Sequence, residues 1–292
     1  MAIITKAVIL AAGLGTRMLP ATKAVPKEML PVVDKPLIQY AVEEAVASGI
    51  RDIIFVVAEG KEAIIEHFGH LSRVEAYVRE KGDHALLAQV QRPSSLAHYE
   101  YVLQDRPAGI AHAVACAREF VEGEPFALIF PDDLIIGDRP CTAQLIEAYG
   151  ACGGSVIAVE HVDEADIPSY GIVDPAGPGN PARLRGLVEK PARDEAPSRL
   201  GVVGRYVLGP TIFRHIDRIG PGKNGELQLT DALASQIAFG EPVCAFSYVG
   251  RRYDTGRPLG LLVASLGVAL GRDDLREPLL SRMTRLLEGR GD

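Results

Sequence analysis

The sequence lacks several features that would assign the protein to a specialised class. Its 292 residues carry a net charge of −7 with a pI near 5.6, so extensive binding to a nucleic-acid polymer is not expected. The longest apolar run, Leu259–Leu270, contains two glycines and is too short to cross a bilayer. The amino terminus leads into a strand-like run without the regions of a secretory leader. We therefore expect a cytoplasmic protein with no membrane partner.

Cysteine is also scarce. The sequence contains only Cys116, Cys141, Cys152 and Cys244, and none of them belongs to a C-x-x-C or other metal-binding spacing. Structural zinc and iron–sulfur sites are therefore not expected. In a reducing compartment this pattern predicts four buried free thiols.

Apolar strand-like runs alternate with helical patterns through the first half of the chain. We expect strands at Lys6–Leu10, Asp52–Val57, Glu100–Leu103 and Phe126–Phe130, and helices at Pro36–Ser48, Lys61–Phe68, Leu71–Gln91, Gly109–Val121 and Thr142–Ala151. This alternation predicts an α/β fold with helices on both faces of a mainly parallel sheet. Because no disordered linker follows, the later strand-like runs predict a mixed extension of the same sheet; they are Ser155–Glu160, Gly171–Asp174, Leu184–Val188, Val202–Leu208 and Val243–Tyr248.

The end of the chain returns to helical periodicity. A helix over Asp274–Glu288 would place six apolar side chains on one face: Leu275, Leu279, Leu280, Met283, Leu286 and Leu287. This stripe either packs onto the chain's own sheet or remains exposed at one edge. In the second case it would favour association between subunits.

A long loop, Ala11–Leu30 (AAGLGTRMLPATKAVPKEML), follows the first strand. Ordering this loop costs backbone entropy and buries little apolar surface, so burial does not offset the cost, and a long ordered loop of this kind is usually functional. Its glycines allow backbone N–H groups to approach an anion, and Arg17 and Lys27 add positive charge. A dinucleotide-binding fingerprint would have glycine at Met18 and start a helix, which the following prolines prevent. The loop therefore predicts phosphate binding of another kind.

Charged residues also follow three later strands. Asp132 and Asp133 come after the strand that ends near Phe130, at the sheet edge where ligands of α/β proteins bind. Paired carboxylates beside a phosphate site suit Mg²⁺, although an Asp-Asp turn or a helix cap is the simpler interpretation. Asp254 permits the same two interpretations. Glu189-Lys190 ends another strand and is either a substrate-binding pair or a surface ion pair.

The loop motif resembles the signature of the sugar-nucleotide pyrophosphorylases, G-x-G-T-R-x₂-P-x-T-x₃-P-K, and the similarity extends from about residue 5 to about residue 270. Within that family, Lys27–Pro31 and Asp34–Tyr40 resemble the bacterial enzymes that make UDP-glucose. The resemblance implies a Rossmann-like nucleotidyltransferase fold, a three-layer α/β/α arrangement. It also implies one domain over residues 1–292, with a nucleotide-binding half (about 5–135), a sugar-phosphate-binding half (about 136–256) and C-terminal helices (about 257–292) for oligomerisation.

The implied reaction joins UTP and glucose 1-phosphate to give UDP-glucose and pyrophosphate, with Mg²⁺ as cofactor. The sugar phosphate would attack the α-phosphorus directly, so no nucleophilic side chain is required. Two alternatives remain: a related pyrophosphorylase using dTTP or another hexose 1-phosphate, and a non-catalytic sugar-nucleotide sensor. The sensor should lack the charged site residues, which this sequence has. The family also implies a homo-oligomer, a dimer or a tetramer.

The resemblance assigns roles residue by residue. The catalytic residues are Arg17, Lys27 and Lys190, of which the first two would bind pyrophosphate and the third the sugar phosphate. The implied nucleotide-binding residues are Ala11, Ala12, Gly13, Gly15, Gln104 and Gly109. The implied sugar-phosphate-binding residues are Asp133, Gly171, Glu189, Lys190, Val203 and Gly204. The implied metal ligands are Asp132 and Asp254, with Asp133 as the substitute for Asp132.

The segment expected to read the base departs from the family. Family members commonly have Gly-Leu-Gly-His where this chain has Gly109-Ile-Ala-His112. The amide of Gln104 can both donate and accept hydrogen bonds, so it can pair with the edge of a pyrimidine.

Overall fold

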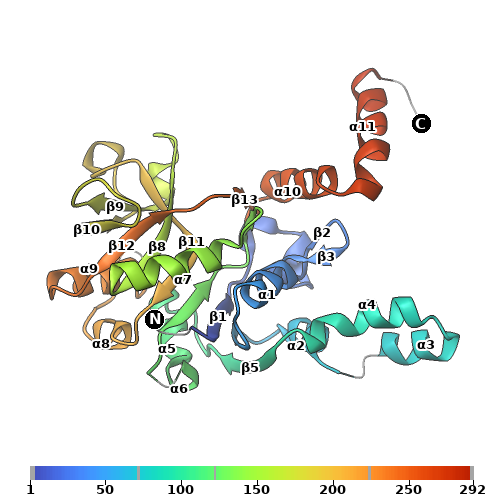
Figure 1. Cartoon of the computed structure of the whole chain (residues 1–292), viewed down its shortest axis with the longest axis horizontal. Helices are drawn as coiled ribbons and strands as arrows, with labels where there is room; N and C mark the ends of the chain where they lie inside the picture. Colours follow the sequence, from blue (N-terminus) through green and yellow to red (C-terminus); the bar gives the residue numbers. More distant parts are fainter. Residues whose placement is uncertain (1–3, 71–72, 122, 223–224, 290–292) are drawn as a thin grey trace.

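A nine-stranded sheet forms the centre of the computed structural model, which describes residues 4–70, 73–121, 123–222 and 225–289 (Figure 1). The strand order is β5-β4-β1-β6-β11-β8-β12-β10-β9. The strands are β1 (Lys6–Ala11), β4 (Asp52–Val57), β5 (His98–Leu103), β6 (Phe126–Ile129), β8 (Ser155–His161), β9 (Gly171–Pro175), β10 (Ala182–Glu189), β11 (Leu200–Leu208) and β12 (Val243–Ser247). Only β10 and β11 run against the others, so the prediction of a mixed, mainly parallel sheet is confirmed.

Helices cover both faces of this sheet, as predicted. One face packs against α1 (Leu37–Ala47), α2 (Glu62–Phe68) and α7 (Cys141–Cys152), and the other against α5 (Ile110–Cys116), α6 (Arg118–Val121), α8 (Ile212–Ile216) and α9 (Leu229–Ala238). Successive side chains of a strand point to opposite faces, so Ile9 of β1 packs with the α1 side and Val8 with the α5 side. Both faces of the central strands are therefore buried from solvent, which explains their continuous apolar runs.

Two predicted helices are interrupted in the structure. The segment expected as one helix over Leu71–Gln91, whose first two residues lie outside the described residues, forms α3 (Arg73–Lys81) and α4 (His84–Ser95). Gly82 has a left-handed φ of 74° between them, and the Asp83 carboxylate caps α4 by accepting a hydrogen bond from Leu86 N at 3.0 Å. The segment expected as Gly109–Val121 likewise forms α5 and α6.

Two short antiparallel strand pairs were not predicted from the sequence. The strand β7 (Asp133–Ile136) pairs antiparallel with β13 (Arg251–Asp254), and β2 (Pro31–Val32) pairs with β3 (Lys35–Pro36). These strands are too short for a periodic apolar pattern. The β7–β13 register sets Asp133 opposite Asp254, so two segments far apart in the sequence meet here.

The prediction of four free thiols is wrong for two cysteines. The structure joins Cys152 and Cys244 in a disulfide, whereas Cys116 and Cys141 are free. Cys152 ends α7, and the chain then returns along β8, which pairs in parallel with β12 so that Cys244 lies opposite Val156. The two cysteines are 92 residues apart in sequence, and only this strand pairing brings them together.

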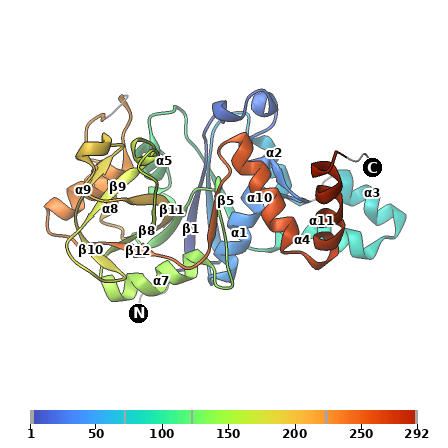
Figure 2. The same cartoon turned by 90° about the horizontal axis from the view of Figure 1, so that it is seen from above.

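The C-terminal helices are α10 (Pro258–Leu270) and α11 (Asp273–Leu287). Ala264 of α10 is buried against Val32 of β2 and Tyr253 of β13, whereas α11 stands away from the body of the molecule in Figure 1. Seen from above, the two helices overlie the side of the molecule that carries α1, α3 and α4 (Figure 2). None of the described side chains of α11 is buried; Leu286 and Leu287 are 72% and 86% exposed. The apolar stripe of α11 therefore does not pack onto the sheet of its own chain. Within the described residues, no helix combines the length and apolar character needed to cross a membrane.

Candidate active site

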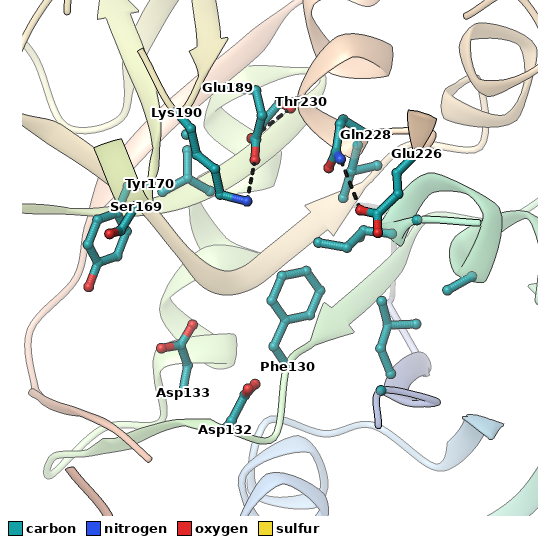
Figure 3. A pocket seen from close by; sticks show the side chains of 18 of the residues that line it. Phe130, Asp132, Asp133, Ser169, Tyr170, Glu189, Lys190, Glu226, Gln228 and Thr230 are labelled. Carbon is teal, nitrogen blue, oxygen red and sulfur yellow. Dashed lines mark hydrogen bonds and ion pairs between the residues drawn. The ribbon is translucent and has the colours of Figure 1, made fainter. Parts of the chain in front are cut away.

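A cavity of about 590 Å³ opens where β1, β5 and β6 end, and the segments around β9, β10 and β11 close its far side (Figure 3). Most of the residues that the sequence assigned to the site line it: Ala12, Gly13, Arg17, Lys27, Gln104, Gly109, Asp132, Asp133, Gly171, Glu189, Lys190 and Asp254. Four assigned residues do not line it: Ala11, Gly15, Val203 and Gly204. The structure thus brings together residues from both halves of the chain in a volume typical of ligand pockets.

The glycine loop (residues 11–30) forms one wall of this cavity. It folds into three short 3₁₀ turns: Thr16–Met18, Ala21–Lys23 and Lys27–Met29. Gly15 adopts a left-handed φ of 68°, and its carbonyl accepts a hydrogen bond from Thr22 Oγ1 at 2.9 Å. The loop therefore has a defined shape although it contains no α-helix, and it holds Arg17 and Lys27 at the cavity.

Lys27 forms the shortest link between this loop and the acidic turn after β6. Its Nζ lies 2.6 Å from Asp132 Oδ2, and Arg17 Nη2 lies 4.0 Å from the same oxygen. Burial alone would lower the pKa of the Lys27 ammonium, but Asp132 and Glu28 hold it above its usual value. Burial alone would raise the pKa of Asp132, but Lys27 keeps it below the usual range. Both groups are therefore charged at neutral pH.

The pairing of β7 with β13 brings the second carboxylate, that of Asp254, to the same place. Thr255 N and Oγ1 both donate to the Asp132 carbonyl at 2.8 Å, while Asp254 Oδ1 accepts a hydrogen bond from Gly256 N at 3.0 Å. Within the described residues, no cluster of three or more His, Cys, Asp or Glu residues forms a metal site. Two carboxylates beside a phosphate site match the donor set that Mg²⁺ takes, since this ion keeps several waters and binds substrate phosphates.

Asp133 has a different environment. Its Oδ2 accepts a hydrogen bond from Gly204 N at 2.7 Å, and its Oδ1 accepts one from Arg252 Nε at 2.6 Å. A Cβ at position 204 would lie only 2.6 Å from Asp133 Oδ2, so glycine is needed for this contact. Burial raises the pKa of Asp133, and Arg252 only partly offsets this effect. With both oxygens engaged, Asp133 is less available to a metal than Asp132.

The opposite wall, here called the strand wall, consists of Gly171, Glu189 and Lys190. The β9–β10 register sets Glu189 directly opposite Gly171. Glu189 accepts a hydrogen bond from Thr230 Oγ1 at 3.0 Å, and its other oxygen lies 3.1 Å from Lys190 Nζ (Figure 3). A Cβ at position 171 would lie 2.9 Å from Thr230 Cγ2, so this wall has no room for a side chain there. Lys190 has a left-handed φ of 47°, a conformation that is uncommon for non-glycine residues and occurs often at functional sites.

Gln104 and Gly109 lie at the end of the cavity beside β5. Gln104 directly follows that strand, and its Nε2 lies 3.1 Å from His112 Nδ1 and 3.4 Å from the Gly109 carbonyl. Gly109 has a φ of 103°, and a Cβ there would lie 2.4 Å from the Leu227 carbonyl. The loop therefore depends on glycine at this position.

The sequence profile of the nucleotidyl transferase family matches residues 6–269. The chain belongs to this family. It is 44% identical over 285 residues to the UTP–glucose-1-phosphate uridylyltransferase of Bacillus subtilis, with 97% of each chain covered. The resemblance seen in the glycine loop is thus confirmed at the level of the family.

Solved structures agree with this assignment. A UTP-bound UGPase from Acinetobacter baumannii is 37% identical and superimposes with a TM-score of 0.89, over 97% of this chain and 100% of that one. A UDP-glucose pyrophosphorylase complexed with UDP-glucose is 36% identical, with a TM-score of 0.84 over 92% of this chain and 100% of that one. The nucleotidyltransferase fold predicted from the sequence is confirmed.

The residues of this nucleotidyl transferase site that were not predicted from the sequence include Lys61 and Arg252. Lys61 Nζ donates to the Gly13 carbonyl at 2.8 Å and to Glu28 Oε2 at 2.7 Å, beneath the glycine loop. Arg252 joins Asp133 to the hydroxyl of Tyr170 across the cavity. Nothing in the sequence pattern distinguishes either cation from a surface residue, apart from the position of Lys61 near the carboxyl end of β4.

Lys61 and Glu28 form a buried pair. Their side chains are 7% and 1% exposed, and Glu28 Oε1 has no hydrogen-bond partner among the described residues. Burial raises the pKa of Glu28, and the nearby Lys61 and Lys27 ammonium groups oppose this shift. In a trans peptide the carbonyl and the next N–H point in opposite directions. Because Lys61 holds the Gly13 carbonyl inside the protein, the Leu14 N–H points away from Lys61.

Proposed function

We propose that this nucleotidyl transferase transfers a uridylyl group from UTP to glucose 1-phosphate, forming UDP-glucose and pyrophosphate. The observation that carries the proposal is the convergence on one cavity of the Arg17–Lys27 pair, the Asp132–Asp254 turns and the strand wall. Uridylyltransferases at 44–45% identity over nearly the whole chain support this choice of substrates. A sugar-nucleotide sensor would not need to retain both the cations and the carboxylates of this cavity.

The residues favour a direct transfer. An oxygen of the sugar phosphate forms a bond to the α-phosphorus of UTP, and the bond to the bridging oxygen breaks so that pyrophosphate leaves. Lys190 would hold the attacking phosphate, while Arg17 and Lys27 would stabilise the negative charge that grows on pyrophosphate. The substrate supplies the nucleophile, so the protein acts by positioning and by charge stabilisation.

We also propose that Asp132 and Asp254 hold Mg²⁺. Asp132 directly precedes β7 and Asp254 ends β13, and these two strands pair with each other, whereas both oxygens of Asp133 are already hydrogen-bonded. When bound there, Mg²⁺ would neutralise charge between the two phosphate groups. Lys27 and a bound Mg²⁺ would compete for the Asp132 carboxylate, so the Lys27 ammonium would then turn from Asp132 toward the phosphates.

One assay tests the reaction and its alternatives. Pyrophosphate release should be measured with UTP and dTTP against the 1-phosphates of glucose, galactose and mannose, with and without Mg²⁺. We expect release only with Mg²⁺ and fastest with UTP plus glucose 1-phosphate. Faster release with dTTP or another hexose would reassign the substrate, and tight UDP-glucose binding without any release would favour the sensor.

We further propose that the protein is a cytoplasmic homo-oligomer in which residues 257–292 contribute to the interface. The exposed leucines of α10 and α11 form an apolar surface that a second subunit can cover: Leu259, Leu262, Leu280, Leu286 and Leu287. In a reducing compartment Cys152 and Cys244 would be thiols. Thiol alkylation followed by mass measurement in freshly lysed cells tests this, because an alkylation-resistant pair would argue against that compartment.

A further inference from the structure

The amide of Gln104 is held in one orientation. Its nitrogen faces two groups, His112 Nδ1 at 3.1 Å and the Gly109 carbonyl at 3.4 Å. A carbonyl can only accept a hydrogen bond, so it selects the NH₂ end of the amide. The NH₂ group has two hydrogens, and these two acceptors engage both. Gln104 is 9% exposed and lines the cavity, so its oxygen is the end that remains for a ligand.

His112 is the partner of Gln104 whose ring nitrogen can either donate or accept a hydrogen bond. It sits in the first turn of α5, which is anchored to the neighbouring loop because Ala111 N donates to the Leu227 carbonyl at 3.0 Å. Its Nδ1 accepts a hydrogen bond from Gln104 only when the ring is neutral and its hydrogen is on Nε2. His112 does not line the cavity, so it acts on a ligand only through Gln104.

The free oxygen of Gln104 has a chemical consequence. Uracil carries a hydrogen on N3 and can donate it to an amide oxygen, whereas N3 of cytosine is an acceptor and would be repelled. A site whose polar group is left unpaired by the wrong ligand discriminates strongly against that ligand. If the amide turned over, its NH₂ end would face the base and the preference would reverse.

We propose that His112 is a positioning residue that fixes the Gln104 amide with its oxygen toward the base, so that the site accepts bases with an N3–H and rejects cytosine. The proposal rests on the proposed function, in which Gln104 reads the base of UTP. It assigns to His112 a part in nucleotide choice that does not require contact with the nucleotide. Thymine also carries an N3–H, so His112 should not affect the choice between UTP and dTTP.

The test compares two substitutions of similar size. In His112→Asn the side-chain oxygen takes the place of Nδ1 as an acceptor, whereas His112→Leu removes the acceptor. The measurement is kcat/KM for UTP, CTP and dTTP with glucose 1-phosphate at saturation. We expect His112→Leu to reduce the UTP/CTP ratio at least tenfold, with the UTP/dTTP ratio unchanged and His112→Asn close to the parent. Both kcat/KM values of a ratio are measured on one preparation, so a smaller fraction of folded enzyme lowers them equally and leaves the ratio unchanged.

Several results would overturn the proposal. An unchanged UTP/CTP ratio in His112→Leu would show that the amide is oriented without His112. An equal loss of ratio in His112→Asn would show that the shape of the ring, and not its acceptor, is what matters. Gln104→Ala serves as the reference, because an unaltered UTP/CTP ratio there would mean that Gln104 does not read the base. If His112→Leu does not fold, His112→Ala removes the same acceptor with less bulk. Absence of UTP turnover in the parent would instead reject the proposed function.

Discussion

The two walls of the cavity achieve their shape by different means. The strand wall belongs to the sheet, where the β9–β10 ladder sets Glu189 opposite Gly171. The glycine loop has no ladder and depends on bonds from side chains distant in sequence, above all from Lys61 to the Gly13 carbonyl. A wall built on strands shares its support among many hydrogen bonds, whereas the loop relies on a few buried contacts. Substitutions beneath the loop should therefore act at long range on the nucleotide end of the site.

The largest effect is expected at the acidic turn after β6, which contacts the glycine loop. Asp132→Ala removes a proposed Mg²⁺ ligand and the partner of Lys27, so kcat should fall by roughly a hundredfold or more, the scale of losing a main electrostatic group. Steady-state rates at several Mg²⁺ concentrations measure this change. Near-normal turnover would mean that Asp132 is only a turn residue.

Lys61→Met tests whether the glycine loop depends on its buried tether. Freeing the Gly13 carbonyl should raise KM for UTP by roughly 30-fold and leave KM for glucose 1-phosphate near the parent value, since small displacements of positioning groups are costly. Removing one partner of a buried pair also destabilises the fold by about 3–5 kcal/mol. Initial rates and thermal unfolding measure the two effects.

Two further variants separate the role of the tether from that of stability. Lys61→Met with Glu28→Leu replaces the whole pair with apolar groups and should recover most of the stability but not the affinity for UTP. Lys23→Met, at an exposed lysine of the same loop, should change neither. Recovery of KM for UTP together with stability would show that the buried pair serves folding alone.

Lys190→Ala tests the strand wall, where we expect the sugar phosphate and not the nucleotide to be affected. It should raise KM for glucose 1-phosphate by about tenfold, the value of a charge-assisted contact, and change KM for UTP much less. Glu189 and the sheet register remain in place, so thermal stability should be close to that of the parent. Equal changes in both KM values would contradict the division of the cavity into two walls.

The smallest effect on turnover is expected at the C-terminal helices, which belong to neither wall. The double variant Leu279→Glu, Leu286→Glu places charge on the apolar stripe of α11, at one half-buried and one exposed leucine, so it should separate subunits without altering either KM. Light scattering on the parent and on the variant measures their masses. A monomeric parent would end the oligomer proposal, and an unfolded variant would indicate that α11 packs within its own chain.

Much of the fold was predictable because the signals were local. The apolar runs of β1, β4 and β6 mark strands buried on both faces, and their positions were close to those observed. The break at Gly82 was missed because helical periodicity continues across it. The β7–β13 strand pair was missed because strands of four residues carry too little pattern.

The sequence by itself determined the alternation of strands and helices, the motif of the glycine loop and the charged residues at the strand ends. These features depend on neighbouring residues, so they are visible in one dimension. Other contacts were decided only by the tertiary structure. They are the hydrogen bonds from Lys61 to the Gly13 carbonyl and from Arg252 to Asp133, the contact between His112 and Gln104, and the disulfide between Cys152 and Cys244. Each of these contacts depends on which strands become neighbours and on how helices and loops pack around them. No local pattern of residues specifies that choice.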